Sequence, residues 1–188
     1  MFTVFYLFIV MQRLGELRIA RKNEKWMKDQ GALEFGSSHY TYMLLLHTSF
    51  LMSFLLEVLI FNKEISPVWS SILLLFIATQ LLRIWAIRSL GKYWNTKILI
   101  VPDAVVIQKG PYRFLRHPNY FIVGLEIILI PILFQAYVTA LIFTVLNMWM
   151  LSIRIPIEEA ALSETTKNYS DYIQEKSRFR PKLNKNIE

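Results

Sequence analysis

The sequence contains no cysteine and only six glycines among its 188 residues. The absence of cysteine excludes disulfides, thiolate catalysis and cysteine-ligated zinc. None of the glycines falls in a G-x-G-x-x-G or phosphate-loop pattern, and neither H-E-x-x-H nor G-x-S-x-G occurs. We therefore expect no Rossmann domain and none of the common hydrolase sites.

Charged residues are scarce as well, at 19% against 54% hydrophobic residues, a balance too apolar for an ordinary soluble domain. The net charge is +7. In so apolar a chain, this excess is typical of cytosolic loops and of contact with anionic lipid headgroups. No basic run is interleaved with aromatic residues as a nucleic-acid stacking surface would be, so we expect a lipid bilayer and no nucleic acid as partner.

Histidine is rare too, with three in the chain. His39 lies in a polar loop and His47 lies alone in an apolar segment, positions that more often belong to structural histidines than to metal ligands. No metal site is expected.

The apolar residues form segments of the length that a membrane-spanning helix needs, about 20 residues. Three such segments cover residues 2–19, 42–61 and 68–87, and the apolar run 120–155 is too long for one span. Pro131 and the break at 134–136 divide that run into a hairpin of two short helices. We predict an all-α integral membrane bundle of about five transmembrane helices, followed by a polar tail that is helical over its first part.

The basic residues predict the orientation of the bundle. The segment 21–39 carries four basic residues, 88–119 carries six and 154–188 carries seven. By contrast, Lys63 is the one basic residue between the second and third apolar segments, and the turn 135–139 has none. Basic loops stay in the cytosol. We expect a multi-pass protein of the cell membrane with its N-terminus outside and its C-terminus and active site cytosolic. Residues 1–88 would form the first three helices and residues 89–188 the catalytic part.

The connector ends in an unusual stretch, Gly-x-Tyr-x-x-x-Arg-His-Pro-x-Tyr at residues 110–120. Pro118 disfavours helix at His117 and suits the first turn of the next helix. Arg116 and His117 should therefore lie at the membrane face, near the positive end of that helix. By themselves these residues fit an interfacial anchor as well as a site.

A second group of charges lies at Arg154, Glu158 and Glu159. Arg154 and Glu158 share a helix face if the helix continues through Pro156. Two adjacent carboxylates are unexpected at a cytosolic helix end, where basic residues prevail. Together with the Arg-His-Pro stretch they would enclose a polar pocket that is open to the cytosol and backed by membrane helices.

These two groups, followed by Tyr169-x-x-Tyr172 and Arg178-Phe-Arg-Pro181, resemble the isoprenylcysteine carboxyl methyltransferase family over about residues 90–182. The resemblance implies an integral membrane enzyme that uses S-adenosylmethionine without a Rossmann domain and releases S-adenosylhomocysteine. Two positions depart from the family pattern: Asn119 stands where a small residue is common, and Ala104 where some relatives have a polar residue. Neither departure affects the centre of the motif.

The resemblance also implies roles for particular residues. Arg154 would be catalytic and would face the substrate, with Arg116 and Glu159 as further substrate-binding residues. The residues implied for cofactor binding are Ala104, Val105, Val106, Ile107, Tyr112, His117, Pro118, Asn119, Tyr120 and Glu158.

The acceptor implied by the family is the carboxylate of a prenylated cysteine that enters from the membrane. A small lipid with an acidic oxygen, such as an alkylpyrone polyketide, is an open alternative. Phospholipid N-methylation is weaker, because an amine acceptor would favour a carboxylate partner over Arg154. A non-catalytic scaffold would have no reason to keep the Arg154 and Glu158 spacing, and a sterol-reductase-like enzyme would need a nicotinamide site for which the sequence offers no candidate.

Overall fold

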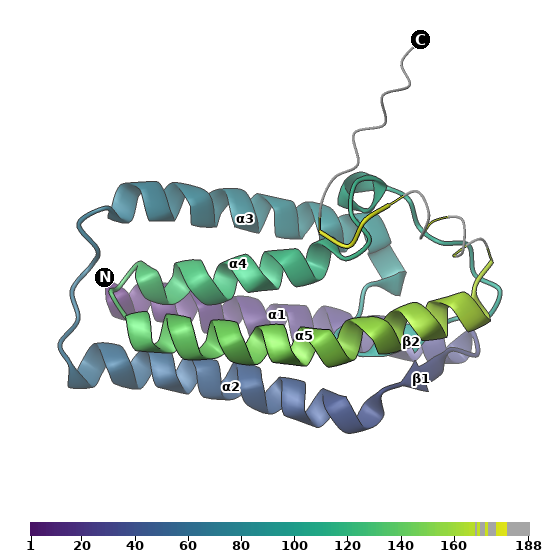
Figure 1. The fold of residues 1–188 in the computed structure, drawn as a ribbon, viewed down its shortest axis with the longest axis horizontal. Helices are drawn as coiled ribbons and strands as arrows, with labels where there is room; N and C mark the ends of the chain where they lie inside the picture. Colours follow the sequence, from purple (N-terminus) through teal and green to yellow (C-terminus); the bar gives the residue numbers. More distant parts are fainter. Residues whose placement is uncertain (168, 170–171, 173–175, 180–188) are drawn as a thin grey trace, which may run out of the picture.

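The computed structural model describes residues 1–167, 169, 172 and 176–179. Within these residues, five α-helices lie side by side in one bundle (Figure 1). This arrangement confirms the predicted helical bundle without a Rossmann domain. The helices are α1 (Phe2–Asp29), α2 (Ser37–Ile60), α3 (Trp69–Leu90), α4 (Pro118–Ile132) and α5 (Tyr137–Thr165).

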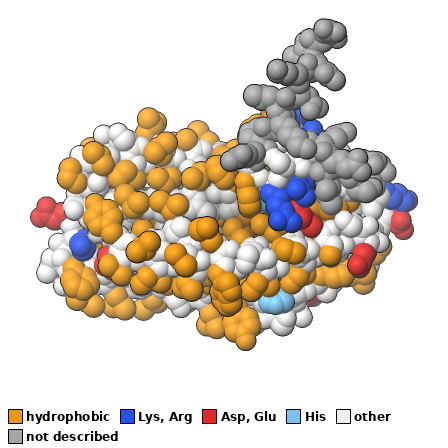
Figure 2. Space-filling model, viewed as in Figure 1, with side chains coloured by type: hydrophobic (Ala, Val, Ile, Leu, Met, Phe, Trp, Pro, Cys, Tyr) orange, Lys and Arg blue, Asp and Glu red, His pale blue; other side chains and the backbone are white. Residues whose placement is uncertain are grey.

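Apolar side chains cover most of the visible surface of the bundle. Most of the visible charged ones lie toward one end, with a few at the opposite end (Figure 2). Helices α2, α3 and α5 are long and apolar enough to cross a membrane. Helix α4 is apolar but has 15 residues, and α1 is less apolar than the others because it carries charged side chains along its length. The N-terminus, the α2–α3 loop and the α4–α5 turn lie at the end opposite the long connectors (Figure 1).

The predicted hairpin is present, but the prediction of two short helices was wrong for α5, which has 29 residues. The turn forms because Pro131 lies in the last turn of α4 and Gln135 takes a left-handed φ of 55°. Helix α5 continues through Pro156, which costs it one backbone hydrogen bond, and ends at Thr165. The helix expected at the start of the polar tail is therefore the last part of α5. Most of the tail beyond Thr165 lies outside the described residues.

Helix α1 is also ten residues longer than the predicted segment 2–19, since its polar continuation extends past the apolar stretch to Asp29. A two-stranded antiparallel sheet follows, which the sequence analysis did not predict. Strand β1 (Leu33–Phe35) pairs with β2 (Ile98–Ile100), so that Glu34 is opposite Leu99. The sheet ties the α1–α2 loop to the 88–119 connector and packs Ile98 and Ile100 against Ala161 of α5.

Glu57 explains the one charge inside the second apolar segment. It is buried on α2, and its carboxylate accepts hydrogen bonds from the backbone N–H groups of Val138 (3.2 Å) and Thr139 (2.7 Å). The hydroxyl of Thr139 donates a third, at 2.6 Å. Helix α5 has no side-chain cap of its own, so Glu57 satisfies its free N–H groups from the neighbouring helix.

Candidate functional site

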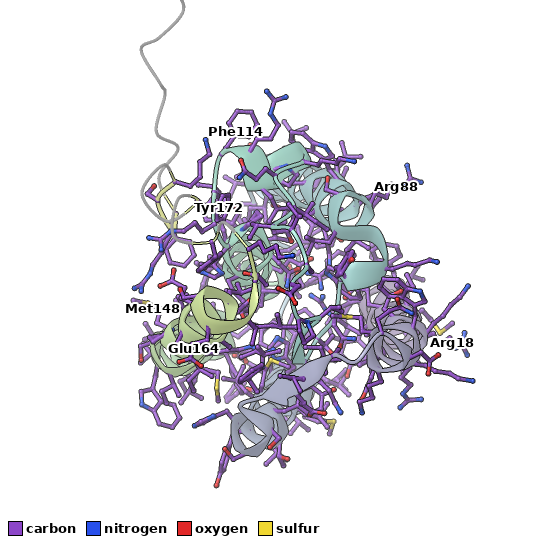
Figure 3. All side chains as sticks on the ribbon, turned by 90° about the vertical axis from the view of Figure 1, so that its right-hand side faces the viewer. Arg18, Arg88, Phe114, Met148, Glu164 and Tyr172 are labelled. Carbon is purple, nitrogen blue, oxygen red and sulfur yellow. The ribbon has the colours of Figure 1, made fainter. Side chains whose placement is uncertain are left out.

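All five helices and the 88–119 connector line one cavity of about 450 Å³. It runs from the connectors at the charged end of the bundle to the interior between the helices. Seen from that end, Arg18 and Arg88 point outward from α1 and α3 (Figure 3). Residues from both predicted parts, 1–88 and 89–188, line the cavity, so α1 and α2 contribute walls to it.

The segment Ala104–Ile107 forms one wall at the polar end of the cavity. It is held against the end of α5 because the N–H of Asp103 donates to the carbonyl of Thr165 at 2.9 Å. The N–H of Lys167 donates to the carbonyl of Ala104 at 3.3 Å. These backbone bonds place an apolar surface beside the site without using any side chain.

The 3-10 turn Gly110–Arg113 positions Tyr112 on the cavity. Gly110 has a φ of 56°, and a Cβ there would lie 2.0 Å from the Ser89 hydroxyl oxygen, so only glycine lets the turn pack on α3. From the other side, the Tyr172 hydroxyl donates to the carbonyl oxygens of Tyr112 (2.8 Å) and Leu115 (3.1 Å). Tyr112 is thereby clamped between α3 and the C-terminal segment.

Helix α4 begins at Pro118, as the sequence predicts, and this start brings His117 and Tyr120 together. Their rings stack with centroids 5.4 Å apart. The Tyr120 hydroxyl donates to the Glu158 carboxylate and accepts from Nε of Arg154 at 2.9 Å. Arg154 and Glu158 do share a helix face, and Tyr120 links them.

Arg154 is buried where α5 passes the connector. One of its terminal nitrogens donates to the carbonyl of Thr96 at 2.5 Å, and its guanidinium lies over the Tyr120 ring, 6.0 Å from the centroid. These contacts hold the side chain in one place along the cavity. A fixed, buried cation suits binding of an anionic oxygen.

Glu159 and Pro118 are not among the residues that line the cavity. The Glu159 carboxylate is bound to Arg116 (2.7 Å), His117 (3.1 Å) and Arg178 (2.5 Å). Its charge therefore joins the connector, α5 and the C-terminal segment to one another. Pro118 is buried in the first turn of α4. The other residues predicted for the site all line the cavity: Ala104, Val105, Val106, Ile107, Tyr112, Arg116, His117, Asn119, Tyr120, Arg154 and Glu158.

Several buried polar atoms at this end of the cavity have no hydrogen-bond partner within the part of the chain that the structure describes. They are the hydroxyls of Tyr112 and Tyr169, the Oδ1 of Asn119 and the indole N–H of Trp94. Burial, reinforced by nearby carboxylates, raises the pKa of both tyrosines well above the ordinary value, so both stay neutral donors. Unpaired buried polar atoms are rare in folded proteins, and here they fit a polar molecule bound in the cavity.

The sequence analysis named Tyr169 and Tyr172 only as part of a motif. It also missed several polar cavity residues on the helices, among them Arg13, His47 and Asn147. Arg13 interrupts the first apolar segment, and its unfavourable place within a span was a signal of function. Asn147 lies seven residues before Arg154, a spacing that puts both on one helix face. For His47 the pattern held no signal.

Comparison with known proteins identifies the family of the chain. A model of the isoprenylcysteine carboxyl methyltransferase family matches residues 72–164, a range that contains both charged motifs. The uncharacterized protein YpbQ of Bacillus subtilis (strain 168) is 48% identical over 164 residues, which cover 87% of this chain and 98% of the relative. An uncharacterized protein of Haemophilus influenzae (strain ATCC 51907 / DSM 11121 / KW20 / Rd) is 30% identical over 160 residues, which cover 82% of this chain and 91% of the relative.

Proposed function

The chain belongs to the isoprenylcysteine carboxyl methyltransferase family, and from this we propose that it is an S-adenosylmethionine-dependent O-methyltransferase. The acceptor is an acidic oxygen, a carboxylate or an enol, on a lipophilic molecule that enters from the membrane. The observation that carries the proposal is the continuous cavity of about 450 Å³. It joins the Arg154 guanidinium and the Glu158 carboxylate to tyrosine hydroxyls that have no hydrogen-bond partner among the described residues.

The polar end of the cavity fits the cofactor by chemistry. The Ala104–Ile107 wall and the aromatic rings would pack the adenine. Glu158, with 28% of its side chain exposed, would accept hydrogen bonds from the ribose hydroxyls or the ammonium group. His117, Pro118, Asn119 and Tyr120 would form the corner beside them, and Tyr112 would donate its unpaired hydroxyl.

When bound, the cofactor would supply an electrophilic methyl group attached to a sulfonium. The sulfur leaves as a neutral thioether, so the leaving group needs no proton. The acceptor oxygen is already anionic near neutral pH, so no strong base is required of the protein. Arg154 holds that oxygen with parallel hydrogen bonds, and the cavity walls exclude water and keep donor and acceptor aligned. Arg154 is the catalytic residue in this proposal, and the contacts with Tyr120 and Thr96 position it.

Two kinds of acceptor fit this chemistry. One is the carboxylate of a prenylated cysteine, and the other is the acidic oxygen of a small lipid such as an alkylpyrone polyketide. Phospholipid N-methylation fits less well because a cation at Arg154 repels an amine that develops positive charge. A non-catalytic scaffold leaves the unpaired polar atoms of the cavity unexplained.

Cofactor binding is the direct test of this proposal. The purified full-length protein in detergent is expected to bind S-adenosylmethionine and S-adenosylhomocysteine in calorimetric titrations. Tyr112→Phe removes one hydroxyl that has no partner among the described residues and should weaken binding about tenfold, as loss of one buried hydrogen bond does. Tyr137→Phe, at an exposed position on the far end of α5, should not change the affinity. Absence of binding by the unaltered protein would refute the proposed activity.

Orientation in the membrane is a second part of the proposal, with the connectors and the cavity mouth in the cytosol. The basic loops lie at one end of the bundle, as the positive-inside rule requires. A reporter enzyme fused after Gln135, in the α4–α5 turn, is therefore expected to report an extracytoplasmic position. A reporter fused at the C-terminus should report a cytosolic one. A cytosolic signal at Gln135 would contradict this orientation.

A further inference from the structure

The cavity extends past Arg154 into the membrane part of the bundle, where the methyl-transfer chemistry does not use it. Asn147 lies on the same face of α5 as Arg154, seven residues nearer the N-terminus, which places it ~10 Å deeper. Asn147 is only 5% exposed, and its amide, which forms no hydrogen bond with another described residue, borders the cavity. A buried amide without a partner is unfavourable, so a ligand group that bonds to it would be favoured.

The part of the cavity beyond Arg154, at the level of Asn147, is its inner end. Two further helices present polar atoms to this inner end. The Nδ1 of His47 on α2 lies 2.9 Å from the carbonyl oxygen of Met43, so this nitrogen carries the proton and Nε2 is left as an acceptor. Arg13 on α1 donates to Glu16 (3.0 Å) and Glu126 (2.6 Å), and 21% of its side chain stays exposed. Both residues line the cavity together with Asn147.

Arg13 belongs to a group of buried charged side chains whose charges sum to zero. Arg83 on α3 donates to Glu126 at 2.5 Å and to Glu16 at 2.6 Å, which completes a buried cluster of two arginines and two glutamates. Gln80 adds a hydrogen bond to Glu126 at 2.7 Å. Because the cluster is neutral, a further charge would upset it, whereas a neutral group that donates and accepts hydrogen bonds would suit Arg13, His47 and Asn147. Ionisable groups at such depth commonly mark a functional site.

The inner end of the cavity lies close to the apolar surface of the bundle. Leu14 of α1 and Leu44 of α2 each line the cavity, and each is 46% exposed. Displacement of these two side chains would give a molecule with a hydrocarbon chain a route from the bilayer to the inner end that avoids the polar mouth.

We propose that Arg13, His47 and Asn147 form a second subsite, the inner polar subsite, which binds a hydroxyl or carbonyl group on the acceptor's hydrocarbon chain. That group lies ~10 Å from the oxygen held by Arg154, which corresponds to roughly eight to nine bonds of an extended chain. The inference rests on the proposed function for the identity of the methylated oxygen. It selects oxygenated lipids over acceptors whose chain is hydrocarbon alone.

The test compares two acids that differ in one hydroxyl, octadecanoic acid and 10-hydroxyoctadecanoic acid. Their affinities are measured by calorimetry on the full-length protein in detergent, with and without S-adenosylhomocysteine. The hydroxy acid is expected to bind about tenfold more tightly, the effect of one buried hydrogen bond. Asn147→Leu should reduce the preference for the hydroxy acid to about twofold or less. Met148→Leu, at the next position but 64% exposed on the outer side of α5, should keep the preference (Figure 3).

Equal affinities for the two acids in the unaltered protein would overturn the subsite, and so would failure of the hydroxy acid to bind. This comparison needs no variant, so it holds even if Asn147→Leu does not fold. A preference that survives in a folded Asn147→Leu protein would also overturn it. Methyl transfer from S-adenosylmethionine is scored separately: a protein that prefers the hydroxy acid but neither binds the cofactor nor transfers a methyl group keeps the subsite and refutes the proposed function.

Discussion

Replacing Arg154 by alanine is expected to lower methyl transfer by ~10³-fold and to change the affinity for S-adenosylmethionine by no more than about threefold. Loss of one preorganised group that stabilises an oxyanion typically costs ~10²–10³ in rate. Here the lost group is also the buried cation that holds the acceptor. Arg154→Lys keeps the charge but loses the paired hydrogen bonds, so it should recover only part of the activity.

This experiment needs both readouts on the same preparation. Transfer is measured as methylated acceptor formed from labelled cofactor, and affinity by calorimetry with S-adenosylmethionine in the absence of acceptor. Arg88→Ala removes an arginine that points away from the bundle at the end of α3 and should change neither quantity (Figure 3). If Arg154→Ala instead eliminates cofactor binding while the protein stays folded, Arg154 belongs to the cofactor and not to the acceptor.

Replacing Arg83 by methionine is expected to destabilise the bundle by ~3–5 kcal/mol. The change removes one cation from the buried cluster and leaves Glu16 and Glu126 with only Arg13 to share. Breaking a buried ion pair from one side is costly because the remaining charge is left uncompensated. The measurement is the free energy of unfolding of the purified protein in mixed micelles.

Two comparisons separate charge imbalance from lost packing. Arg83→Met combined with Glu16→Gln restores a neutral cluster and should recover part of the stability, so that the two changes are not additive. Arg88→Met makes the same substitution on an exposed part of α3 and should cost ~0.5 kcal/mol or less. If Arg83→Met is as mild as Arg88→Met, the cluster does not hold the helices together.

The local features of the sequence predicted the parts of this molecule that depend on neighbouring residues. Segment length and hydropathy predicted five helices, and Pro118 predicted where α4 begins. The motif at residues 110–120 and the Arg154 and Glu158 spacing indicated the family. Helix ends were predicted less well: α1 and α5 both run on beyond their apolar stretches, because a helix end depends on capping and packing more than on hydropathy.

The pairings across the bundle were decided only by the tertiary structure. Glu16, Arg83 and Glu126 stood in the sequence as separate interruptions of three apolar segments, and packing makes them one neutral cluster with Arg13. The three-residue strands β1 and β2 are too short to show an alternating hydropathy pattern. They form because the fold brings the two segments side by side, where they pair.

The sequence by itself determined a helical membrane bundle and the family motifs at one end of it, because span length, proline placement and i, i+4 spacing are local properties. Only the tertiary structure decided that the cavity continues ~10 Å beyond Arg154 to Asn147, and that α1 and α2 form part of its wall. A cavity is the space left between helices far apart in the chain. Its shape therefore depends on how those helices pack, which no single segment specifies.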